Sequence, residues 1–248
     1  MNRESRTQRI LFQVAVGIIL LVGVTVVYVQ VTAPSEDCVN HATARVTIIL
    51  DRTSSYSKIQ RLNLDKTVAE IVRGAPSNAQ INVFYMTKDG GQPRTVLSLC
   101  RPNDVNPING DPDDFRFWLQ RKVVDQIRKV IDLPIGNGEH APIVETLDTL
   151  SRERLLSRDN GPDAIYLFSG MIQNSPNGSL DGCMAPGQER TQGLAVYIAD
   201  VQQFYRGTPF YVYELLRNPP QEQPAAVRAC IRLFWEHVLP EVKSWEPL

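Results

Sequence analysis

RVTIILDRTSS, the stretch from Arg45 to Ser55, joins a run of apolar and β-branched residues to a polar cluster that begins at Asp51. An apolar run of this length that ends at once in polar residues predicts a buried strand. Asp51 then stands at the carboxyl end of that strand, the edge where doubly wound α/β sheets bind ligands. We therefore expect a functional site within residues 51–55.

The segments that follow alternate between strand and helix patterns. Gln80–Met86 and Arg94–Leu99 are strand-like and are joined by a turn with two adjacent glycines, which predicts a hairpin. Ala164–Ser169 and Phe210–Leu215 are two further strand-like runs. Helices are expected at 57–73, 113–131 and 192–205, from Pro142 to Leu150, and in a closing segment that contains Val227 and Val238.

Two of the expected helices carry a predicted buried stripe. The stripe of the helix at 57–73 comprises Ile59, Leu62, Val68, Ile71 and Val72. The stripe of the helix at 113–131 comprises Phe117, Trp118, Val124, Ile127 and Ile131.

This order of elements predicts the fold class. Strands that are separated by helices need crossover connections, which place the strands parallel and the helices on both faces of the sheet. The hairpin adds an antiparallel strand at the edge. We predict an α/β fold of Rossmann-like architecture: a doubly wound, mostly parallel sheet with one antiparallel edge strand.

A membrane anchor is predicted before this domain. Residues 11–31 (LFQVAVGIILLVGVTVVYVQV) contain no charged side chain, and a stretch of that length and character spans a bilayer. Three arginines precede it and an acidic pair follows it, so residues 1–10 are expected to stay in the cytoplasm. The predicted organisation is a tail at 1–10, a transmembrane helix at 11–31, a linker at 32–44 and an extracytoplasmic domain at 45–248.

A cleaved signal peptide is the alternative interpretation of the same segment. Its apolar region is longer than in such peptides, and cleavage after Ala33 would place Pro34 next to the scissile bond. We therefore favour a retained, single-pass anchor. The favoured location is a bacterial inner membrane with the domain in the periplasm.

Composition limits the classes of partner. The chain has 248 residues, 43% of them hydrophobic and 21% charged, enough for one folded domain with a core. Without residues 1–31, which hold three arginines and one glutamate, 23 basic and 26 acidic residues remain, a net charge of −3. A nucleic-acid partner is not expected, because such domains carry a basic excess.

Four cysteines, Cys38, Cys100, Cys183 and Cys230, form an even set in a domain placed outside the cytosol. Two disulfides are therefore expected, and all three connectivities stay open. No CxxC pair is present, which disfavours a zinc knot or a thioredoxin-like redox site. Cys230 lies in an apolar helical pattern, and a free core thiol is the alternative there.

The loop after the first strand offers oxygen ligands. Asp51, Thr53 and Ser55 follow one another at two-residue steps, which aims hard oxygen atoms toward one point and suits Mg²⁺ or Mn²⁺. The alternative is that Thr53 and Ser55 cap the next helix, because these residue types are common caps.

This loop resembles the metal-ion-dependent adhesion site of the von Willebrand factor A (vWA) domain. That family uses Asp-x-Ser-x-Ser, and Asp51, Thr53 and Ser55 match it with threonine in the middle. The stretch 141–147 (APIVETL) is similar to the Thr-Pro-Leu-x-x-Ala-Leu segment that opens a family helix, and 167–171 (LFSGM) is similar to the strand that ends in Ser-Asp or Thr-Asp. The resemblance spans roughly 44–238 and implies the same α/β fold.

The sequence departs from the family at two metal ligands. Ala141 stands at the position of the coordinating threonine, and Gly170 at the position of the second aspartate. Because ligand number and charge set the affinity of such sites, Asp51, Thr53 and Ser55 are expected to form a remnant site with weak Mg²⁺ or Mn²⁺ binding or none. Glu139 and His140 are neighbouring side chains that offer substitute ligands.

Enzyme motifs are mostly missing. Ser55-Tyr56-Ser57-Lys58 fits the Ser-x-x-Lys pattern of penicillin-binding enzymes, but Ser-Asp-Asn and Lys-Thr-Gly do not occur in the chain. Neither does a Gly-x-Ser-x-Gly elbow, a phosphate-binding glycine loop or a His-Glu-x-x-His helix. A degenerate nucleotide-binding domain is disfavoured for the same reason.

The function predicted from the sequence is recognition of a protein partner, within an envelope or membrane complex. The expected contact surface is the rim, which comprises the loop 51–55, the segment 138–142 and the loop 170–187. Arg52, Tyr56, His140 and Met171 are the expected contacts on it. The alternative is a metal-assisted envelope hydrolase or transferase that uses Asp51, Thr53 and Ser55.

Overall fold

The computed structural model describes residues 38, 42–53, 55–87, 92–102, 112–133, 140–152, 163–180, 183, 191–216 and 224–248. The predicted anchor at 11–31 and the tail before it lie outside these residues, as do most of the linker and parts of the rim. Among the described residues, no helix is both long and apolar enough to cross a bilayer. The boundaries assigned to the anchor therefore stay predictions.

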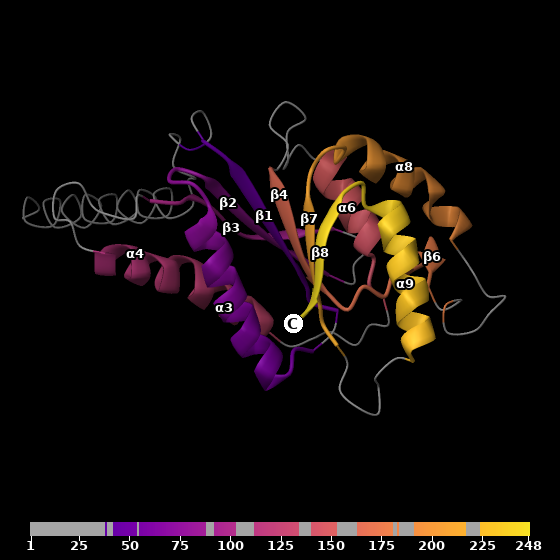
Figure 1. Ribbon diagram of the computed structural model, residues 1–248, viewed down its shortest axis with the longest axis horizontal. Coiled ribbons are helices and arrows are strands. Elements are labelled where there is room, and N and C mark those ends of the chain that lie inside the picture. Colours follow the sequence, from indigo (N-terminus) through magenta and orange to yellow (C-terminus); the bar gives the residue numbers. More distant parts are fainter. Residues whose placement is uncertain are drawn as a thin grey trace, which may run out of the picture.

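A six-stranded sheet forms the centre of the domain (Figure 1). Its order is β3-β2-β1-β4-β7-β8, with β3 antiparallel at one edge and every other neighbouring pair parallel. The strands are β1 Arg45–Asp51, β2 Gln80–Met86, β3 Arg94–Cys100, β4 Ala164–Ser169, β7 Phe210–Glu214 and β8 Val242–Pro247. The predicted doubly wound sheet with an antiparallel edge strand is confirmed.

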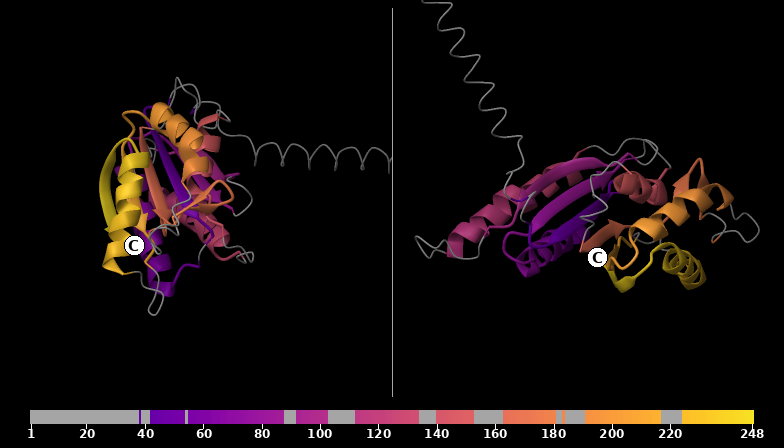
Figure 2. Two further views of the ribbon diagram at one scale, coloured as in Figure 1. Left: turned by 90° about the vertical axis from the view of Figure 1, so that its right-hand side faces the viewer. Right: turned by 90° about the horizontal axis from the view of Figure 1, so that it is seen from above.

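Helices cover both faces of the sheet (Figure 2). One face packs against α3 Lys58–Gly74 and against the continuous helical run α4 Pro112–Trp118, η1 Leu119–Val124 and α5 Asp125–Ile131. The other face packs against α6 Ile143–Arg152, α8 Ala195–Phe204, which follows the short helix η3 Gln192–Leu194, and α9 Ala225–Val238. A small hairpin, β5 Asn174–Ser175 with β6 Gly178–Ser179, lies apart from the main sheet.

The central position of β1 in the sheet determines where the loop after Asp51 lies. β1 pairs with β2 along its whole length and with β4 on the other side, so it is a central strand. Ile48, Ile49 and Leu50 are fully buried, as a strand covered on both faces requires. Asp51 consequently ends a central strand at the carboxyl edge.

Two helical stripes differ from the predicted ones. Ile59 and Leu62 of α3 are exposed, because the buried face of this helix runs through Gln60, Leu64 and Val68. Ser57 caps α3: its Oγ accepts from the Gln60 backbone N–H while the Gln60 side chain accepts from the Ser57 N–H. The prediction that Thr53 or Ser55 caps this helix is wrong.

The helical run from α4 to α5 contains a π-helical segment, which changes the phase of its stripe. Phe117 is exposed, with the Arg121 guanidinium above its ring, and is not part of the core. Phe115, Leu119 and Val123 are buried instead. Phe115, Leu119 and Val123 are spaced by four residues and so share one face of the helical run, whereas Phe117 lies two residues out of that row.

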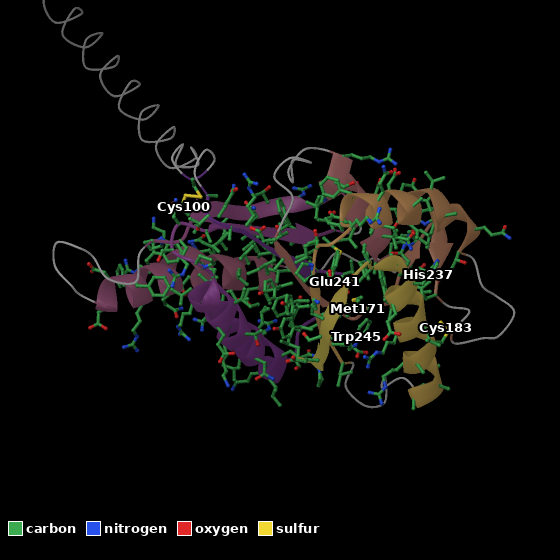
Figure 3. The ribbon with its side chains drawn as sticks, turned by 45° about the horizontal axis from the view of Figure 1, so that its top comes forward. Cys100, Met171, Cys183, His237, Glu241 and Trp245 are labelled. Atoms are coloured by element: carbon green, nitrogen blue, oxygen red, sulfur yellow. A yellow bond between two sulfur atoms is a disulfide. The ribbon has the colours of Figure 1, made fainter. Side chains whose placement is uncertain are left out.

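The strand β8 and both disulfides complete the domain. The sequence does not predict β8, because an edge strand that contains lysine, glutamate and proline lacks an apolar run. Cys38 is bonded to Cys100, and Cys183 to Cys230, so Cys230 is not a free thiol. In Figure 3, Cys100 and Cys183 lie on opposite sides of the domain.

Candidate functional site

The carboxylate of Asp51 is the centre of the rim, and it is almost completely buried, at 2% exposure. Its Oδ1 accepts hydrogen bonds from the Thr53 backbone N–H at 2.8 Å and from the Thr53 Oγ1 hydroxyl at 2.6 Å. Its Oδ2 accepts one from the Ser169 hydroxyl at 2.6 Å. Both oxygens are thus occupied by groups of the chain itself.

Ser169 connects this cluster to the next loop. Its Oγ also accepts from the Met171 backbone N–H at 3.0 Å, and the side chain is fully buried. Ser55, the third residue of the predicted site, is exposed. The sequence pattern at 167–171 includes Ser169 but assigns it no role, because only the tertiary pairing of β1 with β4 brings it to Asp51.

Ala141 and Gly170, which replace the two family ligands, supply no side-chain oxygen. Ala141 is held through its backbone, which exchanges two hydrogen bonds with Asn174 at 2.7 and 3.0 Å. At Gly170, an added Cβ would meet only the Leu215 carbonyl oxygen, at 3.8 Å. The described residues contain no group of three or more His, Cys, Asp or Glu side chains placed to hold a metal ion.

Three of the four predicted partner contacts are buried inside the domain. The Arg52 guanidinium donates to the carbonyl oxygens of Val130 and Leu133, at the carboxyl end of α5, and burial lowers its pKa. Its positive charge there is favourable because a helix ends in a partial negative charge. This arginine therefore fastens the loop 51–55 to α5 and leaves little surface for a partner.

Tyr56 and Met171 are also core residues. Tyr56 is 5% exposed, and burial raises the pKa of its hydroxyl well above the ordinary value. Met171 is fully buried with a left-handed backbone φ of 56°, and its carbonyl oxygen accepts from the Trp235 indole N–H at 2.7 Å. Trp235 of α9 thus holds the start of the rim loop, a role that helical spacing alone does not indicate. Of the four predicted contacts only His140 is exposed.

A second buried carboxylate holds the rest of the rim loop. Glu145 of α6 is 4% exposed and accepts from Gln173 Nε2 at 2.9 Å, from Asn177 Nδ2 at 3.1 Å and from the Ser175 hydroxyl. The Gln173 side-chain oxygen in turn accepts from the Val144 backbone N–H at 3.0 Å. This network joins the loop that carries β5 and β6 to the beginning of α6.

Together these contacts make the described rim an internally hydrogen-bonded surface. Ser169 links the loop after β1 to the loop after β4, and Asn174 links that loop to Ala141. Glu139 and residues 134–138 lie outside the described part of the chain. In the described part of the rim, the carboxylates of Asp51 and Glu145 already have hydrogen-bond donors from the chain itself.

No family model matches this sequence, and a comparison with curated proteins also finds no match. Among solved structures, an aerotolerance-related membrane protein from Bacteroides fragilis is similar over 82% of this chain and 90% of its own, with 12% identity and a TM-score of 0.44. Human COPII-coat protein Sec24c is similar over 83% of this chain and 29% of its own, with 13% identity and a TM-score of 0.45.

A von Willebrand factor type A structure from Catenulispora acidiphila is similar over 79% of this chain and 43% of its own, with 11% identity and a TM-score of 0.38. With TM-scores below 0.5, these likenesses carry no inference about what this chain binds. The doubly wound α/β fold of this chain rests on the strand order of its own sheet.

Proposed function

We propose that this chain is a membrane-anchored vWA-like module that binds a protein partner through its rim without a metal ion. The observation that supports this most directly is the occupation of Asp51, whose two oxygens accept three hydrogen bonds from Thr53 and Ser169. A metal would have to displace these donors. It would also have to bind without the threonine and aspartate ligands that Ala141 and Gly170 replace.

The position of the first disulfide supports the same proposal. Cys100 ends β3 and pairs with Gln80 at the amino-terminal end of β2, opposite the edge where Asp51 ends β1. Cys38 follows the predicted anchor by seven residues, and a chain of that length reaches at most about 25 Å. The disulfide thus ties the membrane-proximal segment to the edge remote from the rim, which leaves the rim directed toward other proteins.

The test is photo-crosslinking from the rim in the full-length chain within its native membranes. A benzophenone amino acid replaces His140, an exposed rim residue, and in a matched control it replaces Arg116, an exposed residue of α4. We expect an adduct with one protein at position 140, unchanged by EDTA, and none at position 116.

Two results would contradict this proposal. Equal adducts at both positions would mean that the rim is not the contact surface. An adduct that EDTA abolishes and Mg²⁺ restores would favour the metal-dependent version of the site.

A further inference from the structure

The described helices cover one face of the sheet over only part of its width. Tyr166 of β4 lies beside Tyr211 of β7, and Tyr213 lies beside both Phe168 and Glu246 of β8. These side chains belong to the face that packs against α3 and the run from α4 to α5. Of the described helices, α6, α8 and α9 pack on the opposite face, and in Figure 1 no helix lies in front of β8.

The exposed part of this face is aromatic. We define the tyrosine face as Tyr166, Tyr211, Tyr213, Ser244 and Glu246, the residues that β4, β7 and β8 place side by side on this side of the sheet. The rings form two stacks, with centroids 4.8 Å apart for Tyr166 and Tyr211 and 4.7 Å apart for Phe168 and Tyr213. All three tyrosines are only half-buried, so part of each side chain is available to a partner.

Carboxylates border these rings. Glu246 is exposed on β8, and Glu70, exposed on α3 and 4.0 Å from Lys66, lies on the side of the face toward α3. Burial first, and then the negative charges of Glu246 and Glu70, raises the pKa of Tyr213 to about 12. The tyrosine face therefore combines apolar aromatic area with a negative border, which favours a partner with apolar and cationic side chains.

The edge strand itself is poorly suited to extension by another strand. Lys243, Glu246 and Pro247 lie along β8, and charged residues and proline on an edge strand disfavour pairing. On the far side of β8, Trp245 donates to Glu214 at 2.8 Å and lies beneath Arg232 of α9, so that side is already covered (Figure 3). A partner would consequently lie across the tyrosine face, as helices lie on the faces of α/β sheets.

We propose that the tyrosine face docks an amphipathic helix of a partner protein, with an apolar stripe against the tyrosines and lysine or arginine beside Glu246 and Glu70. This surface is separate from the rim, so it can be tested independently of the rim proposal. Because few interface residues dominate binding, a charge reversal at Glu246 is expected to weaken docking strongly.

The test uses the full-length chain in phosphatidylcholine nanodiscs and a synthetic helical peptide of leucine and lysine that carries a diazirine crosslinker on its apolar side. A peptide with glutamate in place of lysine is the charge control. Crosslinked sites are located by mass spectrometry. We expect adducts on the segments that contain Tyr211, Tyr213 and Glu246, and at least a tenfold lower yield with Glu246→Lys or with the glutamate peptide.

Glu236→Lys, at an exposed carboxylate of α9 on the other layer, is the matched variant and should leave the yield unchanged. Thermal unfolding of both variants shows whether they remain folded. Adducts of equal yield in the Glu246→Lys variant, or adducts located elsewhere, would overturn the proposal. So would a concentration-dependent dimer that Glu246→Lys dissociates, because the occupant would then be a second copy of the chain.

Discussion

The chemical environment of Asp51 differs from the one that its sequence pattern indicates. The pattern of alternating oxygen-bearing residues indicates a cation site, yet the folded chain satisfies the carboxylate with one backbone N–H and two hydroxyls. Charge-assisted hydrogen bonds of this kind are stronger than neutral ones. The aspartate therefore serves to fix the loop after β1 against β4.

Replacement of this carboxylate tests that role. Asp51→Ala leaves the buried Ser169 hydroxyl without its acceptor, and a buried polar group without a partner costs about 1–3 kcal/mol. We expect a loss of that size in the free energy of unfolding, measured by urea denaturation. Ser55→Ala, at an exposed residue of the same loop, should change it by less than about 0.5 kcal/mol. Equal effects of the two substitutions would mean that Asp51 is not a structural anchor.

The two missing ligands can be restored. Gly170 has room for a side chain, with only the Leu215 carbonyl oxygen 3.8 Å from an added Cβ. In the double variant Ala141→Thr with Gly170→Asp, we expect Mn²⁺ to raise the unfolding temperature. The corresponding gain in the free energy of unfolding is up to about 2.7 kcal/mol when the Mn²⁺ concentration is a hundred times Kd. The wild type should show no shift.

The matched variant for this measurement is Ala141→Thr with Gly170→Asn, which has the same size but lacks the new carboxylate and should respond less. A shift in the wild type that Asp51→Ala abolishes would contradict the metal-free proposal. It would support the hydrolase or transferase alternative.

At the scale of elements, α6 carries two buried carboxylates with different functions. Glu145 holds the rim loop, whereas Asp148 faces α8 and accepts from Arg152 Nε at 2.9 Å. Arg152 also pairs with Asp200 of α8. Burial raises the pKa of Asp148 above its ordinary value of 3.8, although the Arg152 guanidinium opposes this.

The sign of the resulting pH dependence follows from proton binding. A carboxyl with a raised pKa binds more protons in the folded state than in the unfolded state, so its contribution to stability falls as the pH rises above about 3.8. We expect the wild type to lose stability relative to Asp148→Asn as the pH rises above about 3.8, because the folded state then gives up the proton that burial favours. Urea denaturation at several pH values measures this difference.

Asp200→Asn is the control for that series, because it removes the other partner of Arg152 at a 40% exposed side chain. Its stability relative to the wild type should vary less with pH. A wild type that gains stability relative to Asp148→Asn as the pH rises would contradict the expected direction.

For the whole molecule, the disulfides act at opposite ends of the structure. Cys38–Cys100 ties the segment before β1 to the edge strand β3, and Cys183–Cys230 ties the rim-loop side to α9. The rim loop and the segment before β1 are thus held by different covalent links.

Each disulfide is expected to stabilise the domain by a similar amount. The bridges span 62 and 47 residues, and loops of such similar length differ little in closure entropy. Cys38→Ser with Cys100→Ser should cost about 2–4 kcal/mol, and Cys183→Ser with Cys230→Ser about the same. Urea denaturation of the two double variants provides the comparison. A cost near zero for the first pair would mean that the tether does not constrain the unfolded chain.

Much of this architecture follows from the sequence alone. The apolar run at 45–50, the hairpin and the alternation of strands with helices predict the sheet, because each pattern is local and is set by backbone periodicity. The missing oxygen donors at Ala141 and Gly170 are equally visible in the sequence. The strand β8 is not, because an edge strand needs no apolar run.

Only the tertiary structure decides which polar groups meet. Ser169 reaches Asp51 because β4 pairs beside β1, Arg52 turns inward to the end of α5, and Trp235 bonds to Met171 from a helix 64 residues away. Hydrogen bonds between distant segments leave no periodic signal in a single sequence. For the same physical reason, the burial of three predicted contacts and the partial exposure of the tyrosine face are evident only once the described layers are in place.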